Sequence, residues 1–206
     1  ETSDYHRRRK EINAFNAKSP ILKRGLAISP LKFGISFHVT FFNQAGALVH
    51  IYQDGSILVN HGGIEMGQGL NTKIAQIVAH ELGVDLSSVR CTATDTQKIP
   101  NTSPTAASTG CDLNGKAAQD AARQIRERLA EFAAQRLRVA ADSIVFAKGH
   151  VSGGGQWIAF KDLVNEAYLG RVQLWSDGFY TTPLVHWDWG PLQGQPFFYF
   201  TYGASV

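Results

Sequence analysis

The sequence predicts an α+β fold, a layered α/β sandwich of mixed and antiparallel strands with two main helices. Short strand-like runs with one polar face are separated by Gly-, Asn- and Asp-containing turns. Residues 71–84 and 112–138 instead carry apolar side chains at helical spacing. The strands and helices alternate too irregularly for a barrel or a doubly wound sheet.

Composition narrows the class of protein before any motif is considered. The 206 residues are 44% hydrophobic and 18% charged, which favours a folded chain with one core or two small ones. A net charge of +3 is too small to predict a nucleic-acid partner. No apolar stretch approaches the ~20 residues of a membrane span. Two scattered cysteines, Cys91 and Cys111, are typical of a reducing compartment, so we expect a cytoplasmic protein without membrane contact.

The first quarter of the chain predicts a helix followed by strands. Residues 3–17 place Tyr5, Ile12 and Phe15 at near-helical spacing, and the basic run at residues 6–10 is interpreted as its solvated face. Aromatic and β-branched residues predict a strand over 31–46. Residues 46–62 then predict a hairpin with a tight two-residue turn at Asp54-Gly55.

The remaining elements follow from periodicity and from turn residues. We expect the helix over 71–84 to end at Gly83, and the helix over 112–138 to be capped by Asp112. The segments between and after these helices predict a strand over 89–96, a glycine-tipped hairpin over 143–160, a short helix over 161–170 and a strand-rich tail.

The two ends of the sequence predict that it is part of a longer polypeptide. The first residue is Glu1, and the single methionine is Met66. Residues 195–206 form an apolar run typical of a buried strand, which is a poor natural terminus. We therefore expect residues 1–206 to be a fragment of one domain of a larger subunit, with a sub-boundary near residues 140–155.

A glycine-rich loop at residues 62–69 directly precedes the first main helix, where free N–H groups and the helix dipole favour an anion. It does not match a phosphate-binding P-loop, because Gln68 and Gly69 stand where Lys and Ser or Thr are needed. It does not match the dinucleotide fingerprint G-x-G-x-x-G either, because Thr72 stands where the third glycine would follow Gly67 and Gly69. The loop offers backbone donors and the neutral amide of Gln68; the alternative is an ordinary strand-to-helix turn.

A second loop, residues 102–110, precedes the other main helix. Its residues are small or hydroxyl-bearing, which permits close backbone approach; alone, it would be interpreted as a Ser/Thr-rich connection with a helix cap. If both helix starts point into one cleft, they form a site for an elongated anionic ligand.

Phe37 and His38 are a further candidate pair. Strand alternation places them on opposite faces, so only one can face a pocket without a bend. By base rate Phe37 is a core residue. His38, like the weaker candidates His61 and His80, has no neighbouring carboxylate to orient it, and no nucleophile has an identifiable base.

The sequence resembles the molybdenum-cofactor-binding large subunit of the molybdenum hydroxylase family. The motifs are "EMGQGL" at residues 65–70, shared with aldehyde oxidases, and "SPTAAS" at 103–108 followed by "DLNG" at 112–115, which favour the xanthine dehydrogenase branch. The resemblance covers nearly the whole chain.

This resemblance implies a site built around molybdenum-molybdopterin. The cofactor contacts it implies are Met66, Gly67, Gln68, Ala107, Ser108, Thr109 and Gly110. Gln68 would lie near the molybdenum, and no side chain of this sequence would bind the metal directly. Phe37 would contact a bound purine ring, with Ala106 and Ala107 in the same pocket. The resemblance thus reverses the base-rate interpretation of Phe37.

The implied reaction is oxidation of hypoxanthine to xanthine and urate, with iron-sulfur clusters and FAD in partner portions of the enzyme. The catalytic base would be a glutamate beyond Val206, so no catalytic residue is expected here. His38 stands where the family commonly has a threonine that bonds a substrate oxygen. Two alternatives stay open: an aldehyde oxidase-type enzyme, and a non-enzymatic module that binds a phosphorylated small molecule.

Overall fold

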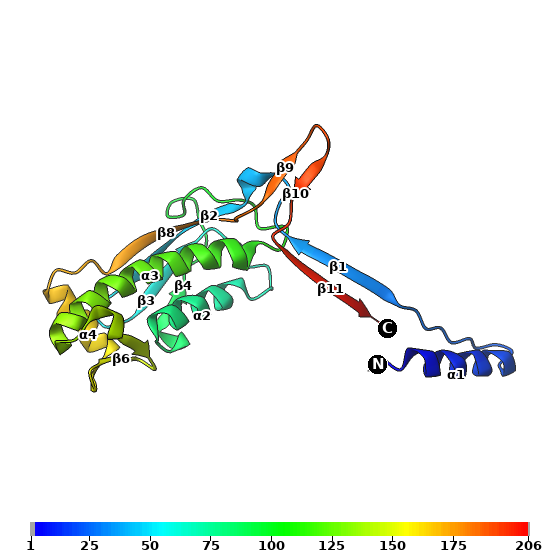
Figure 1. The fold of residues 1–206 in the computed structure, drawn as a ribbon, viewed down its shortest axis with the longest axis horizontal. Helices are drawn as coiled ribbons and strands as arrows, with labels where there is room; N and C mark the ends of the chain where they lie inside the picture. The colour runs from blue at the N-terminus through cyan, green and yellow to red at the C-terminus, as the bar shows by residue number, and fades with distance from the viewer. Residues whose placement is uncertain (1–2, 206) are drawn as a thin grey trace. The chain divides into compact units, whose positions relative to one another are not determined.

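A four-stranded sheet forms the centre of the larger unit of the chain in the computed structural model, which describes residues 3–205 (Figure 1). Its order is β4-β3-β2-β8. β2 (Gln44–Ile51) pairs antiparallel with β3 (Ile57–His61) and β8 (Trp175–Thr181), and β3 pairs parallel with β4 (Val89–Cys91). This mixed sheet confirms the predicted α+β class, and the unit that contains it spans Ser36–Phe198.

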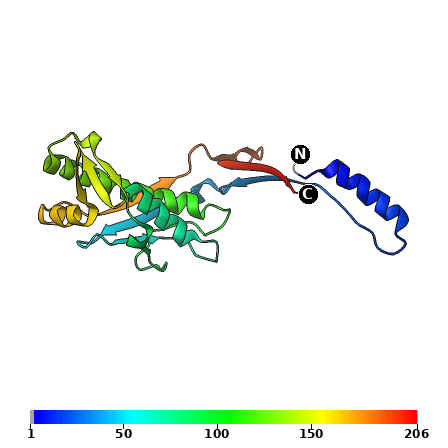
Figure 2. The same ribbon diagram turned by 90° about the horizontal axis from the view of Figure 1, so that it is seen from below.

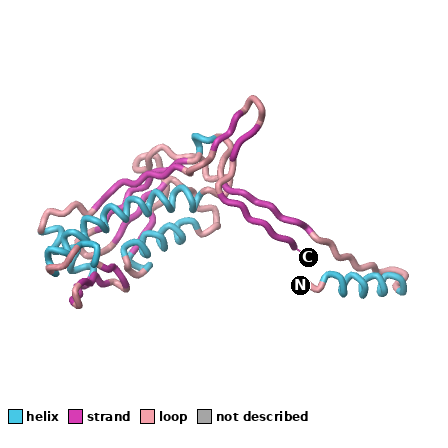
Figure 3. The backbone as a smooth tube through the Cα atoms, viewed as in Figure 1, coloured by secondary structure: helices cyan, strands magenta, loops and turns pink. Residues whose placement is uncertain are grey.

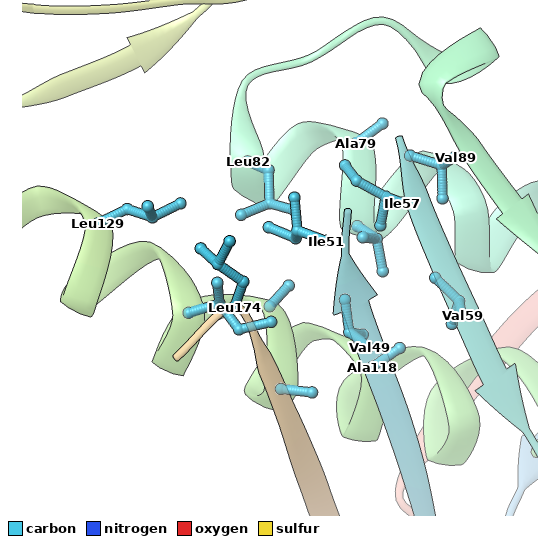
Figure 4. Close-up of a cluster of buried hydrophobic side chains, with 14 of the residues drawn as sticks. Val49, Ile51, Ile57, Val59, Ala79, Leu82, Val89, Ala118, Leu129 and Leu174 are labelled. Carbon is cyan, nitrogen blue, oxygen red and sulfur yellow. The ribbon is translucent and has the colours of Figure 1, made fainter. Parts of the chain in front are cut away.

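Two helices, α2 (Leu70–Leu82) and α3 (Gly110–Leu137), pack on the sheet and against each other (Figures 1 and 2). Alternate residues of β2, such as Val49 and Ile51, point into a core with Leu82 and Leu129 (Figure 4). Burying each such side chain stabilises the fold by about 1.5–3 kcal/mol. These are the two main helices that periodicity predicts, and Gly83 ends α2 in the left-handed conformation as expected.

Small residues let α3 lie directly on β8. A Cβ placed on Gly178 would stand 2.1 Å from the carbonyl oxygen of Ala117 and 2.5 Å from the amide nitrogen of Ala121. Both alanines are fully buried. The alanine-rich face of α3 therefore fixes the distance between helix and sheet.

Most of the other elements of this unit lie at the two ends of the sheet and its helices (Figure 3). Where the sequence predicts one hairpin over 143–160, the structure has three antiparallel strands, because glycines at 149 and at 154–155 each reverse the chain. These strands are β5 (Val145–Ala147), β6 (His150–Gly153) and β7 (Gln156–Ala159), and they precede α4 (Phe160–Leu169). A further hairpin consists of β9 (His186–Asp188) and β10 (Gln193–Gln195). Single 3-10 turns occur at Thr40–Phe42, Leu86–Ser88 and Ala141–Ser143.

The second unit contains the chain up to Ile35 and from Tyr199. The helix α1 (Tyr5–Lys18) agrees with its prediction, and the basic residues 6–10 are exposed. β1 (Ser29–Ile35) pairs antiparallel with β11 (Tyr199–Ser205). The expectation of a buried strand in the tail is wrong for Tyr202, which is 69% exposed, since a two-stranded ribbon has no second layer to cover it.

Two predicted turns and caps differ from the structure. The β2–β3 connection is a five-residue loop, 52–56, because the Asp54 carboxylate accepts hydrogen bonds from the Ser56 amide and hydroxyl. Asp112 does not cap α3: the helix begins at Gly110, so Asp112 lies in its first turn. β4 also ends at Cys91, five residues before the predicted end of that strand.

The predicted strand over 31–46 is interrupted. β1 ends at Ile35, Ser36 has a φ of 110°, and β2 begins only at Gln44. The buried Asn43 side chain explains the break: its Oδ1 accepts from the Phe37 amide, and its Nδ2 donates to the Phe37 and Thr40 carbonyls. These bonds replace ladder hydrogen bonds, so strand alternation does not apply to Phe37 and His38.

The described residues include no helix that is both long enough and apolar enough to cross a membrane. Their division into units falls near residues 35 and 198, and residues 140–155 lie inside the larger unit.

The contact between α3 and β8 yields a stability prediction. We expect Gly178→Ala to lower the free energy of unfolding by about 3 kcal/mol, because the new methyl group meets backbone atoms that cannot rotate away. Gly25→Ala is the matched control, since a Cβ there meets nothing within 4 Å. Denaturant titration of both variants checks this. Equal unfolding midpoints for the two variants would show that α3 can move away from β8 at little cost in stability.

Candidate functional site

The glycine loop before α2 is closed by the side chain of Glu65. Its Oε1 accepts hydrogen bonds from the amides of Gly67 at 2.9 Å and Gly69 at 3.0 Å, and its Oε2 accepts from Asn71 at 3.0 Å. These bonds, led by the one from Asn71, lower the pKa of Glu65. The loop thus carries its own anion at the start of the helix.

Gln68 completes the internal bonding of this loop. Its Oε1 accepts from the Met66 amide at 2.6 Å, and its Nε2 donates to the Ile64 carbonyl at 2.8 Å. The expectation that the loop offers free backbone donors is therefore wrong for four amides, those of Met66, Gly67, Gly69 and Asn71. Sequence patterns identify the glycines but not the side chains that occupy these donors.

The glycines serve two distinct purposes. Gly67 and Gly69 have φ values of 99° and 74°, where a Cβ would meet nothing but the backbone conformation favours glycine. Gly62 instead lies against the second loop, because a Cβ on it would be 2.1 Å from Cγ2 of Thr102. A hydrogen bond of 2.9 Å from the Ile64 amide to Thr105 Oγ1 joins the same two loops.

The second loop reaches α3 through two left-handed residues, Ala107 (φ 51°) and Ser108 (φ 53°). Such conformations are uncommon without glycine, and strain of this kind concentrates at binding sites. Thr109 closes the turn, since its amide and its hydroxyl both donate to the Ala106 carbonyl. No side chain caps the amides at the start of α3.

The two loops enclose one cavity of about 380 Å³ between the starts of α2 and α3. Of the predicted contact residues, five line it: Met66, Gln68, Ala106, Ser108 and Gly110. The other lining residues are Leu70, Lys73, Thr105 and Cys111. The predicted residues Gly67, Ala107 and Thr109 belong to the same loops without lining the cavity. The volume lies within the range of small-molecule sites.

Larger hollows occur elsewhere on this unit. One of about 980 Å³ lies beyond the C-terminal end of α2, and His80 is among its lining residues. Neither predicted loop contributes to it, so the smaller cavity is the better candidate. Within the described residues, no group of three or more His, Cys, Asp or Glu side chains is arranged to hold a metal ion.

His61 is a structural residue beneath the first loop. It is fully buried; Nδ1 accepts from the Gly63 amide at 3.2 Å, and Nε2 lies 2.9 Å from Asn71 Oδ1. Nε2 therefore carries the proton and donates to Asn71. Burial lowers the pKa of His61, so the ring is neutral in the folded protein.

Phe37 lies beside the second loop but does not line the cavity. The Ser36 amide donates to the Ala107 carbonyl at 3.3 Å, which holds the residue before Phe37 against the second loop. The Phe37 ring is half-buried and meets Phe42 edge to face, with 5.5 Å between centroids. Phe37 is thus positioned by Asn43 and Ala107 rather than by a strand.

His38 turns toward the β9–β10 hairpin. Its ring centroid is 5.2 Å from that of Trp189 and 6.3 Å from that of Trp187, both edge to face. The two tryptophans also contact each other at 6.2 Å. Sequence analysis identified His38 but not these partners, because they lie about 150 positions later in the chain.

Lys73 and Cys111 line the cavity without having been predicted. Lys73 lies four residues after Gly69, which is one helical turn. This spacing places it on the side of α2 near the loop, and could have identified it as a lining residue. Burial raises the pKa of the Cys111 thiol, with the Lys73 charge acting in the opposite direction. Cys91 is more strongly affected, and burial raises its pKa to about 11.

Comparison with known families explains this arrangement. The family model described as "Molybdopterin cofactor-binding domain" matches residues 1–206, the whole chain. The chain belongs to this family. The resemblance inferred from the loop motifs is thereby confirmed.

Two curated relatives extend the comparison to whole enzymes. The chain is 46% identical over 204 residues to xanthine dehydrogenase of Emericella nidulans and 46% identical over 197 residues to that of Oryza sativa subsp. japonica. These matches cover 99% and 96% of this chain but only 14% and 13% of those proteins. The chain therefore spans about a seventh of the length of such relatives.

Solved structures share the fold at lower identity. Quinoline 2-oxidoreductase from Pseudomonas putida 86 matches with a TM-score of 0.79 at 22% identity, over 98% of this chain and 26% of that one. The aldehyde oxidoreductase from Desulfovibrio gigas matches with a TM-score of 0.63 at 18% identity, over 97% of this chain and 20% of that one. The domain fold is thus common to enzymes whose names indicate different substrates.

His61 makes the stability of this region dependent on pH. Its folded-state pKa lies below the unfolded value of 6.5, so the unfolded chain binds a proton first on acidification. We expect the free energy of unfolding to fall as pH drops below about 6.5, by at most ~1.4 kcal/mol per pH unit from this residue. Denaturant titrations across this range check it; His61→Gln should flatten the dependence, and an unchanged slope would exclude His61 as its source.

Glu65 should also make stability depend on pH, in a lower pH range than His61 and through its negatively charged form. Its folded-state pKa lies below the unfolded value, so its stabilising effect is present above about pH 4.5 and is lost as pH falls through the folded-state pKa. We expect Glu65→Gln to lower the melting temperature at pH 7. The difference from the wild type should shrink at pH values that protonate Glu65 in both states. Thermal melts of both proteins, with the exposed Glu131→Gln as control, provide the comparison.

Proposed function

We propose that this domain is part of a molybdenum hydroxylase that oxidises purines, hypoxanthine to xanthine and xanthine to urate. The observation that supports this most directly is the cavity between the two loop motifs, at the starts of α2 and α3. The 46% identity to xanthine dehydrogenases supports the purine branch.

The residues of the cavity fit a molybdopterin cofactor. Small side chains at Ala106, Ser108 and Gly110 leave room for a flat ring system, and Lys73 offers a positive charge. Met66 and Gln68 would contact the cofactor from the opposite side. When bound, the cofactor supplies the redox centre and the activated oxygen, while the chain orients it and excludes water.

The Gln68 amide has a defined role in this proposal. Its two internal hydrogen bonds hold it in one orientation before any ligand binds. A fixed dipole close to a reacting centre stabilises charge without reorganising during the reaction. Gln68 would thus act as an oriented polar group near the molybdenum and not as a metal ligand.

Phe37 and the second loop would position the substrate. Asn43 fixes the backbone on both sides of Phe37, and the Ser36–Ala107 hydrogen bond sets its distance from Ala106 and Ala107. A purine would contact the Phe37 ring. His38, packed against Trp187 and Trp189, would replace the threonine contact expected in the family and alter substrate preference.

The remainder of the reaction would depend on other parts of the enzyme. We propose that the catalytic glutamate lies in the rest of the large subunit, and that iron-sulfur clusters and FAD reside in a partner subunit or domain. Electrons from the substrate would leave through these groups, and the whole protein would be cytoplasmic. Residues 1–206 alone would then be inactive.

Turnover assays on two forms of the protein test this function. We expect the full-length protein to contain molybdenum and to oxidise xanthine to urate faster than it oxidises an aliphatic aldehyde. Residues 1–206 supplied with cofactor should form no measurable urate. Metal analysis and urate absorbance provide the two measurements.

Other outcomes would select the alternatives. A molybdenum-containing protein that oxidises aldehydes but not xanthine would indicate an aldehyde oxidase-type enzyme. A full-length protein without molybdenum that binds a phosphorylated small molecule would indicate a non-enzymatic module. Urate formation by residues 1–206 would contradict the assignment of the base to another part of the subunit.

A further inference from the structure

The Gln68 side chain is held in one orientation by the backbone of its own loop. Its Oε1 accepts a hydrogen bond from the Met66 amide at 2.6 Å, and its Nε2 donates to the Ile64 carbonyl at 2.8 Å. A flipped side-chain amide would place oxygen against oxygen and N–H against N–H, so it would lose both bonds. The observed bonds use one N–H and one lone pair of the Gln68 amide. The others are left for a ligand in the cavity that Gln68 lines.

Glu65 fixes the backbone on both sides of Gln68. Its Oε1 accepts from the amides of Gly67 at 2.9 Å and Gly69 at 3.0 Å, the two neighbours of Gln68 in the chain. Both glycines have positive φ values, so this part of the loop would otherwise have wide conformational freedom. Oε2 of Glu65 accepts from the Asn71 amide at 3.0 Å, in the first turn of α2. One carboxylate therefore ties the peptide groups around Gln68 to the helix that follows.

Asn71 connects this carboxylate to the interior of the unit. Its Oδ1 lies 2.9 Å from Nε2 of His61, which is fully buried and neutral. Nδ1 of the same imidazole accepts from the Gly63 amide at 3.2 Å, so His61 also holds the first part of the loop. Asn71 thus bonds to His61 through its side chain and to Glu65 through its main chain. A buried ring is the fixed end of a hydrogen-bond chain that leads to the loop.

These three side chains affect the cavity only indirectly. Neither His61, Glu65 nor Asn71 lines it, whereas Met66 and Gln68, whose geometry they set, both do. They can therefore act on a bound group only through the loop residues that face it. A polar group that is held in place before a ligand arrives is the arrangement that a reacting centre requires.

We propose that His61, Asn71 and Glu65 are positioning residues that hold the Gln68 amide in the orientation in which it meets the cofactor. The orientation follows from the geometry, and the identity of the group that Gln68 meets rests on the proposed function. A helix cap alone would stabilise α2 and leave the Gln68 amide unaffected. The two roles are therefore separable by experiment.

Amide hydrogen exchange in the full-length protein, expressed without cofactor, tests the orientation. The Met66 amide reports on Gln68 directly, because Gln68 Oε1 is its acceptor. Glu65→Ala removes three acceptor contacts, and Asn71→Leu removes the acceptor of the His61 ring. We expect each substitution to speed exchange at Met66 by about tenfold or more. Neither substitution removes the Met66–Gln68 bond itself, so faster exchange would show that this bond depends on them.

Matched variants and a reference amide make the exchange measurement specific. Asn71→Asp keeps an oxygen within reach of the His61 ring and should exchange like the wild type. Gln76→Ala is the control, since Gln76 is an exposed residue of α2 that does not line the cavity. Exchange at the buried Leu129 of α3 reports on global unfolding.

The comparison of Met66 with Leu129 decides the first part of the test. Acceleration at Met66 well beyond that at Leu129 supports the proposal. Equal acceleration at both amides, or none at Met66, overturns it. Glu65→Ala provides this result even where Asn71→Leu does not fold, because Glu65 is exposed and its substitution should leave the core intact.

Steady-state oxidation of xanthine, expressed per molybdenum atom, tests the consequence for the reaction. We expect Glu65→Ala and Asn71→Leu to lower kcat about tenfold or more and to change KM less than about twofold, since a misplaced dipole acts mainly on the transition state. Asn71→Asp and Gln76→Ala should keep the wild-type kcat. A wild-type kcat in both Glu65→Ala and Asn71→Leu, or a change confined to KM, overturns the positioning role.

The two measurements separate this inference from the proposed function. A full-length protein that never contains molybdenum would contradict the proposed function, and faster Met66 exchange in Glu65→Ala would then still support the positioning of Gln68. A molybdenum-containing protein in which Met66 exchange does not depend on Glu65 or Asn71 would support the function and overturn the inference.

Discussion

The close approach of the two loops is the constraint on which the site depends. Gly62 lies so near Thr102 that no side chain fits between them, and the Ile64–Thr105 hydrogen bond holds the same contact. This approach requires α2 and α3 to begin at the same edge of the sheet. That requirement in turn explains the alanine-rich underside of α3, which places the long helix directly on β8.

Sequence periodicity predicts the elements whose stability is local. The helices α2, α3 and α4 and the β2–β3 hairpin follow from apolar spacing and from glycine positions, and the α+β class follows from their order. Local sequence also predicts that each of the two loops directly precedes a helix. Their meeting at one cavity is a tertiary fact, because it depends on how α2 and α3 pack, which the spacing of residues in either helix does not specify.

Polar side chains that bond to backbone groups two to six residues away account for most of the errors. Asn43 breaks a stretch with strong strand propensity, and Glu65 occupies donors that glycine patterns suggest are free. A sequence does not show which Asn or Glu side chains form these hydrogen bonds to the backbone, since both residue types also occur in solvated turns. The Trp187 and Trp189 partners of His38 were missed for a different reason, their long separation from it in the chain.

A binding loop that satisfies its own donors does not need its ligand in order to fold. Glu65 and Gln68 give four amides of the glycine loop and the start of α2 internal partners, so these bonds shape the loop during folding and not at the moment of binding. Ordering a loop costs conformational entropy, and here that cost is met before the ligand arrives. A ligand that enters this cavity can therefore meet a loop that already has its shape.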